Sequence, residues 1–98
     1  MAANKKLTKI IAGRKITSVN QTANALDITF DDNSQAHIKT GANASANAMS
    51  GRTIRSVRQQ GDVMNLDFSD GSSAEITLAE ATSSVILRDA SNKLEYAD

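Results

Sequence analysis

This 98-residue chain repeats part of its own sequence 38 residues further on, and the repeat constrains the fold more than any other feature. Residues 13–40 align with residues 51–78 without a gap. Two copies are too few for a solenoid, which needs about three repeats or more. The sequence therefore predicts a single domain over residues 1–98 that contains an internal duplication. Eleven of the 28 aligned pairs are identical: Gly13/Gly51, Arg14/Arg52, Ile16/Ile54, Ser18/Ser56, Val19/Val57, Gln21/Gln59, Phe30/Phe68, Asp32/Asp70, Ser34/Ser72, Ala36/Ala74 and Ile38/Ile76.

Each copy has the pattern of a three-stranded β-meander. In the first copy the first apolar pair, Ile16 and Val19, is spaced by three residues, which predicts a β-bulge. The next stretch alternates cleanly, with Leu26, Ile28 and Phe30 apolar. Asp, Asn, Gly and Ser then supply the chemistry of a tight hairpin turn before a third alternating strand. Each meander is therefore expected to have one apolar face.

Two further segments flank the first copy. A short N-terminal helix of one or two turns is expected, because Leu7, Ile10 and Ile11 share one side and Gly13 follows them. Residues 41–51 are rich in Ala and Asn and bounded by glycines. This connection fits either a short helix or a small-residue loop.

Residues 83–97 have no counterpart in the first copy and predict a C-terminal hairpin. Val85 and Leu87 alternate, "DASN" has turn composition, and Leu94 and Tyr96 alternate again. Together with the two meanders this gives about eight strands. Because two apolar faces must meet, we expect a mainly β fold, either a sandwich or a partly closed barrel.

Composition narrows the classes of function. Eleven basic residues balance eleven acidic ones, whereas a general nucleic-acid binder needs excess positive charge for its phosphate contacts. The chain has no cysteine, which excludes disulfides and Cys-ligated zinc. The apolar stretch near the first residues is too short for a signal peptide or a membrane span. We expect a soluble, cytoplasmic protein without a cofactor. A core with so few aromatic side chains also favours a homo-oligomer.

Candidate catalytic groups are few. His37, the one histidine, falls on the polar face of a predicted strand, and the second copy has Glu75 there. Asp31, Asp32 and Asp70 could form a carboxylate set, but they fall in predicted hairpin turns, where Asp bonds the local backbone. No nucleophile elbow, phosphate-binding loop or metal-binding motif is present. The sequence therefore predicts neither an enzyme nor a metal site.

The arginines are the stronger candidate set. Arg52, Arg55 and Arg58 lie within seven residues, and the first copy has neutral residues at two of the three equivalent positions. A guanidinium group matches phosphate in a bidentate way. The cluster, together with Arg88 if that residue comes near, could form an anion site. The alternative is a solvated strand face whose charge is balanced by Asp62, Asp67 and Glu75.

The tail "SSVILRDASNKLEYAD" and the Gly-Arg-x-Ile motif before each meander resemble small phage proteins that block nucleotide-signalling defence, the Thoeris anti-defence sponges. The resemblance implies an oligomer that sequesters a cyclic ADP-ribose-type or cyclic-nucleotide signal without cleaving it. It also makes Arg88 and Asn92, which lie in the matching tail, candidate ligand contacts.

Two main functions follow from these features. One is a non-enzymatic oligomeric binding protein that captures a phosphorylated or cyclic-nucleotide ligand. The other is a small protein–protein interaction module that docks a partner through an exposed β edge or the Arg52–Arg58 face. A nucleic-acid binder that uses the same arginines is a third option, which the zero net charge disfavours. The candidate ligand-binding residues are Arg52, Arg55, Arg58, Arg88 and Asn92.

Overall fold

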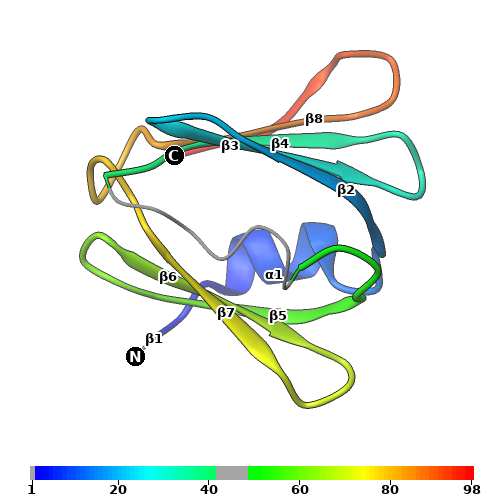
Figure 1. Cartoon of the computed structure of the whole chain (residues 1–98), viewed down its shortest axis with the longest axis horizontal. Helices are drawn as coiled ribbons and strands as arrows, with labels where there is room; N and C mark the ends of the chain where they lie inside the picture. Colours follow the sequence, from blue (N-terminus) through cyan, green and yellow to red (C-terminus); the bar gives the residue numbers. More distant parts are fainter. Residues whose placement is uncertain (1, 42–48) are drawn as a thin grey trace.

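The computed structural model describes residues 2–41 and 49–98, which form two antiparallel sheets that face each other (Figure 1). One sheet has the strand order β1-β5-β6-β7, and the other has the order β2-β3-β4-β8-β9. The sheets are not closed into a barrel, so the fold is a sandwich, as the sequence predicted in its first alternative. The elements are β1 (Ala2–Ala3), α1 (Lys5–Ile11), β2 (Ile16–Gln21), β3 (Ala25–Phe30), β4 (Gln35–Lys39), β5 (Ile54–Gln60), β6 (Val63–Phe68), β7 (Ser73–Thr77), β8 (Val85–Arg88) and β9 (Leu94–Ala97).

Each copy of the repeat forms a meander in a different sheet. The first copy forms β2, β3 and β4, and the second forms β5, β6 and β7. Equivalent residues pair in equivalent registers: Ile16 lies opposite Phe30, and Ile54 lies opposite Phe68. The predicted bulge is present in both copies, directly after Ile16 and after Ile54. The duplication is therefore present in the structure as well as in the sequence.

Reciprocal backbone hydrogen bonds join the two copies where their first strands begin. The amide of Gly13 donates to the carbonyl oxygen of Ile54 at 2.8 Å. The equivalent amide in the second copy, that of Gly51, donates to Ile16 at 2.8 Å. The same reciprocity recurs where the third strands end, with bonds from Gly41 to Thr77 and from Ala79 to Lys39. The two halves are thus related by an approximate two-fold axis.

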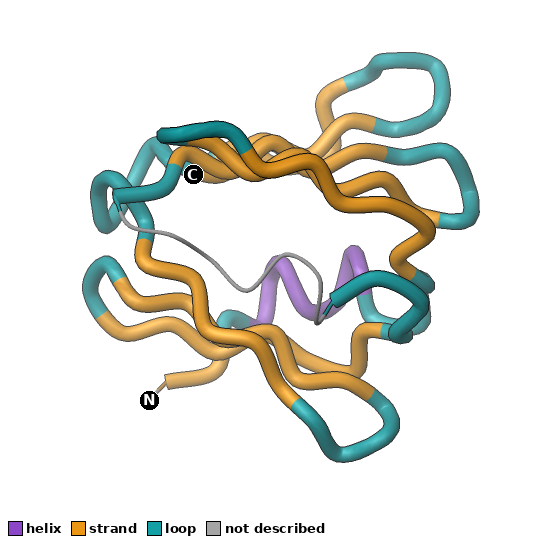
Figure 2. Tube along the Cα trace, viewed as in Figure 1, coloured by secondary structure: helices purple, strands orange, loops and turns teal. Residues whose placement is uncertain are grey.

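The predicted N-terminal helix, α1, lies between the two sheets (Figure 2). The Asn4 side chain caps it by accepting a hydrogen bond from the amide of Leu7 at 3.1 Å. Leu7 and Ile11 are buried and Ile10 is partly buried, so the apolar side of the helix completes the core. Much of its stability comes from this packing, because seven residues are too few for a helix to persist alone.

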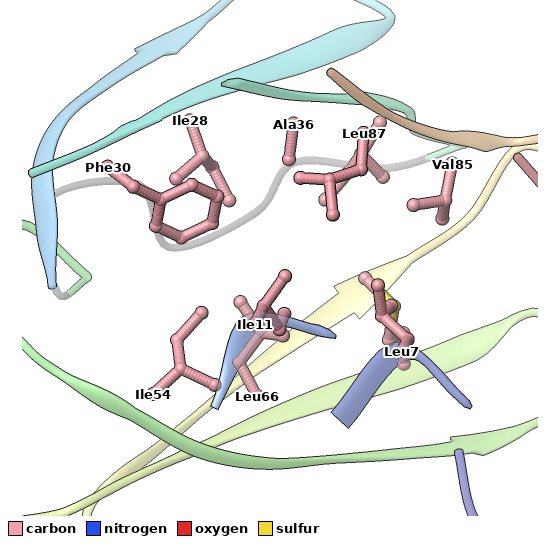
Figure 3. A pocket seen from close by; sticks show the side chains of 11 residues that line it. Leu7, Ile11, Ile28, Phe30, Ala36, Ile54, Leu66, Val85 and Leu87 are labelled. Atoms are coloured by element: carbon pink, nitrogen blue, oxygen red, sulfur yellow. The ribbon is translucent and has the colours of Figure 1, made fainter. Parts of the chain in front are cut away.

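The core between the sheets is aliphatic apart from Phe30, Phe68 and Tyr96. Side chains from α1 and from both sheets line an apolar cavity in this core (Figure 3). Its volume is about 10 Å³. That is about the space of one water molecule, so this cavity cannot hold a nucleotide. A ligand of that size would have to bind at the surface.

The C-terminal hairpin extends the sheet of the first copy. Strand β8 pairs with β4, and β9 pairs with β8. The expected inward alternation holds for Val85, Leu87 and Tyr96, which are buried, and fails for Leu94, which is 56% exposed. A register shift after Leu87 places Leu94 opposite Arg88 on the outer face. The two-residue strand β1, which pairs with β5, carried no sequence signal.

The connection between the copies was expected to be either a short helix or a small-residue loop. Residues 42–48, most of the 41–51 segment, lie outside the described residues. Gly41 and Met49 bound it, and Met49 is buried. The rest of the predicted mainly β architecture is confirmed, namely the short helix, the two meanders and the hairpin.

Candidate functional site

Arg52 takes part in an interaction that the duplication repeats. Its guanidinium bonds the carboxylate of Asp70 and the hydroxyl of Ser72, and it lies 5.9 Å from the centre of the Phe68 ring. The first copy builds the same arrangement around Arg14, which lies 5.9 Å from the ring of Phe30. Arg52 thus ties the start of its meander to the β6–β7 turn, which explains why these residue types match between copies.

Arg14 also has a partner in the C-terminal hairpin. Its guanidinium donates to both carboxylate oxygens of Glu95 in β9, at 2.9 and 3.0 Å, and to Ser34 at 2.9 Å. Asp32 lies 3.3 Å from it. These contacts, led by the hydrogen bonds to Glu95, raise the pKa of Arg14. The pair holds the C-terminal hairpin against the first copy.

Arg58 lies on the outer face of the four-stranded sheet and binds Asp67 in a bidentate way. Its Nε and one terminal nitrogen donate to the two carboxylate oxygens at 2.8 and 2.9 Å. Ser56 donates to the same carboxylate at 3.1 Å. The hydrogen bonds from Arg58 lower the pKa of the Asp67 carboxyl even though burial opposes the shift. The planar fork that would hold a phosphate is already occupied by this carboxylate.

Of the remaining three candidates, only Arg55 lies near the Arg58–Asp67 pair. Arg55 is exposed and adds a weaker electrostatic contribution to Asp67. Arg88 belongs to β8 in the other sheet, and its guanidinium donates to the carbonyl oxygen of Asn92 at 3.3 Å. Asn92 has a φ of +66° within the β8–β9 turn. The structure therefore groups Arg55 and Arg58 around Asp67 and places Arg88 with Asn92 in a separate turn.

The turn carboxylates bond their own turns, as expected for Asp in a hairpin. Asp32 accepts from the backbone amide of Ser34 at 3.0 Å, and Asp70 accepts from that of Ser72 at 2.9 Å. His37 is exposed on β4, and its Nδ1 lies 2.5 Å from Asp27 on β3. No group of three or more potential metal ligands occurs among residues 2–41 and 49–98.

The free edge of β7 offers a different kind of site, made of backbone groups. The amide of Phe68 donates to Ser72, and the amide of Leu78 donates to Asp62. In an antiparallel pair, every second residue directs its N–H and C=O groups toward the neighbouring strand. Ser72 and Leu78 do so toward β6, and Ser73 and Glu75, which lie between them at odd spacing, therefore direct theirs away from β6. Within the described residues no strand lies beyond β7 to receive these four groups.

The equivalent edge in the first copy is occupied. Gln35 and His37 of β4 pair with Arg88 and Ile86 of β8. The amide of Lys39 donates to the carbonyl oxygen of Ser84 at 2.7 Å, which continues the ladder. Two strands that occupy the same place in their copies thus differ at their edges: β4 carries an added strand, and β7 carries none among the residues that the structure describes.

The other sheet edges are less suited to accept a strand. β1 has only two residues. β2 is bulged after Ile16, and β9 is four residues long beside a register shift. Bulges and short strands are the usual means by which proteins block edge pairing. β7 pairs with β6 in an unbroken register over five residues, so its edge is the most regular one in the described part of the chain.

Sequence reasoning did not single out Ser73 and Glu75. The available signal was the tail, which follows the second copy but has no counterpart after the first. One hairpin cannot cover two equivalent edges. Which edge it covers depends on long-range pairing, which the repeat itself does not specify.

The described part of the chain contains no helix that is both long and apolar enough to cross a bilayer. Comparison of the chain with protein-family models, with curated proteins and with solved structures finds no match. The resemblance to the anti-defence sponges stays a prediction.

Proposed function

We propose that this chain is a non-enzymatic protein-interaction module that binds an extended segment of a partner as an added strand on β7. Main-chain hydrogen bonds to an exposed sheet edge are an established mode of peptide recognition. The observation that carries the proposal concerns Ser73 and Glu75: within residues 2–41 and 49–98, no strand covers their edge-directed backbone groups, whereas β8 covers the equivalent groups of β4.

Capture of an anionic ligand by the arginines has weaker support. The guanidinium groups of Arg52 and Arg58 already bond Asp70 and Asp67, and Arg88 lies in the other sheet. A phosphate at any of these positions would have to displace a carboxylate or gather residues that the fold keeps apart. The β7 edge requires neither change.

The proposal can be tested with a peptide that copies the strand already bound to β4. A synthetic peptide with the sequence of residues 83–89, SSVILRD, is titrated into the isotope-labelled full chain. We expect the amide resonances of Ser73 and Glu75 to shift and their hydrogen exchange to slow, because each amide gains an acceptor.

A proline variant and its matched control make the test specific. Glu75→Pro removes the amide that points away from β6 and leaves the hydrogen bonds to β6 in place. Proline is tolerated at such edge positions. Glu75→Ala keeps the amide. Binding should be lost in the first variant and retained in the second. Equal binding to both variants, or peptide-induced shifts confined to other strands, would contradict the proposal.

A further inference from the structure

The strand that covers β4 shows what an added strand on β7 has to match. Leu87 lies opposite Ala36, and Val85 lies opposite Ile38, with both β8 side chains buried in the core layer. The residue between them, Ile86, lies opposite His37 on the outer face. Over these three positions an added strand therefore has two apolar side chains that point into the core, and between them one side chain that points to the outer face.

The residues of β7 that point into the core are the same as those of β4. Ala74 and Ile76 stand where β4 has Ala36 and Ile38, and both are buried. A strand added to β7 is thus expected to place apolar side chains opposite Ala74 and Ile76. The inward positions of the two edges consequently do not distinguish one partner from another.

The residues of β4 and β7 that point to the outer face differ in charge. In β4, His37 is paired with Asp27 of the neighbouring strand at 2.5 Å. In β7 the corresponding pair is Glu75 and Asn65, and no ion pair joins Glu75 to a cation within the described residues. The carboxylate of Glu75 is exposed at the edge, directly beside the groups that an added strand would bond.

We infer that the β7 edge selects a partner protein whose extended segment carries Lys or Arg between two apolar residues. The inference rests on the proposed function and adds the chemistry of the partner. Opposite charges that face each other across an antiparallel pair are favourable, and like charges are unfavourable. A cation opposite Glu75 would supply an opposite charge to a carboxylate that forms no ion pair within the described residues.

A second copy of the chain fits this edge less well. Antiparallel pairing of β7 with itself in a register centred on Glu75 would set two carboxylates opposite each other. Registers centred on Ala74 or Ile76 would place Glu75 opposite Ser73 or Thr77, neither of which is cationic. Charge complementarity therefore favours a different protein.

The experiment compares two peptides that differ at one position. Both carry the sequence of residues 83–89, one with I86K and the other with I86E, so that the changed side chain faces Glu75 in the register of β8 on β4. Each is titrated into the labelled chain and into its Glu75→Lys variant, whose amide spectrum also reports whether the fold is intact. We expect the wild-type chain to bind the lysine peptide roughly fivefold more tightly, and the variant to reverse this preference.

Each other outcome leads to a definite conclusion. Equal affinity of both peptides for the wild-type chain, with shifts at Ser73 and Glu75, overturns the charge rule and leaves strand addition standing. Absence of shifts in β7 with either of these peptides and with the unmodified one overturns both. A dimer seen by light scattering that Glu75→Pro converts to a monomer assigns the edge to a second copy and overturns the choice of partner.

Discussion

Strands β4 and β7 began as equivalent positions of a duplicated unit and now have different surroundings. Both carry Ala and Ile toward the core and both end in reciprocal bonds between the copies. β4 lies inside a five-stranded sheet because the C-terminal hairpin covers it, whereas β7 remains at an edge. A duplication produces two like edges, and a single added element leaves one of them available for another chain.

The largest effect tests whether the two layers really are equivalent. Phe30 and Phe68 occupy matching positions, and each is 1% exposed. Phe30→Ala and Phe68→Ala should each lower the free energy of unfolding by about 3–5 kcal/mol, because each leaves a cavity in the shared core. Urea denaturation measures both. If either variant fails to fold, the Phe→Leu pair provides the comparison, and a large difference between the partners would show that the layers are not equivalent.

Proline at the matching edge positions should separate the covered strand from the free one. His37→Pro removes an amide that pairs with β8 and leaves an acceptor of β8 without its donor, so we expect a loss of about 1–3 kcal/mol in the free energy of unfolding. Glu75→Pro removes an amide without a strand partner and should cost less than about 1 kcal/mol. Thermal and urea unfolding compare them. Similar losses at the two positions would mean that the β7 edge is not free.

The smallest expected effect concerns acid, and it distinguishes Asp67 from its first-copy counterpart, Thr29. Hydrogen bonds from Arg58 lower the pKa of Asp67 in the folded state. The unfolded chain therefore binds more protons near and below the ordinary carboxyl pKa of about 4, and stability is lost as the pH falls through that range. Asp67→Asn should have a lower Tm than the wild-type chain at pH 7, and the gap should narrow toward pH 3. A gap that stays constant with pH would exclude the ion pair as its cause.

Features set by neighbouring residues could be predicted from the sequence. The bulge after Ile16 followed from a spacing of three instead of two, and the hairpin turns followed from Asp, Asn and Gly between alternating strands. Asn33 and Gly71, which occupy the same turn position, both adopt positive φ, at +68° and +89°. The agreement arises because each feature depends on backbone geometry within a few residues.

Features set by distant residues could be predicted only in part. Arg14 bonds Glu95, which lies 81 positions away in the C-terminal hairpin. Asp67 was among the carboxylates expected to balance the arginine face, and it does pair with Arg58, whereas the pairing of Arg52 with Asp70 was not expected. The availability of β7 likewise follows from topology, because the same strand pattern is buried in one copy and peripheral in the other.

The reciprocal bonds between Gly13 and Ile54 and between Gly51 and Ile16 are those of an isologous interface built within one polypeptide. Each half contributes one wall of the sandwich, so neither half can shield its apolar side from water by itself. A half-length unit on its own would need an identical molecule to cover its apolar side, and the single chain supplies that second wall through a covalent connection.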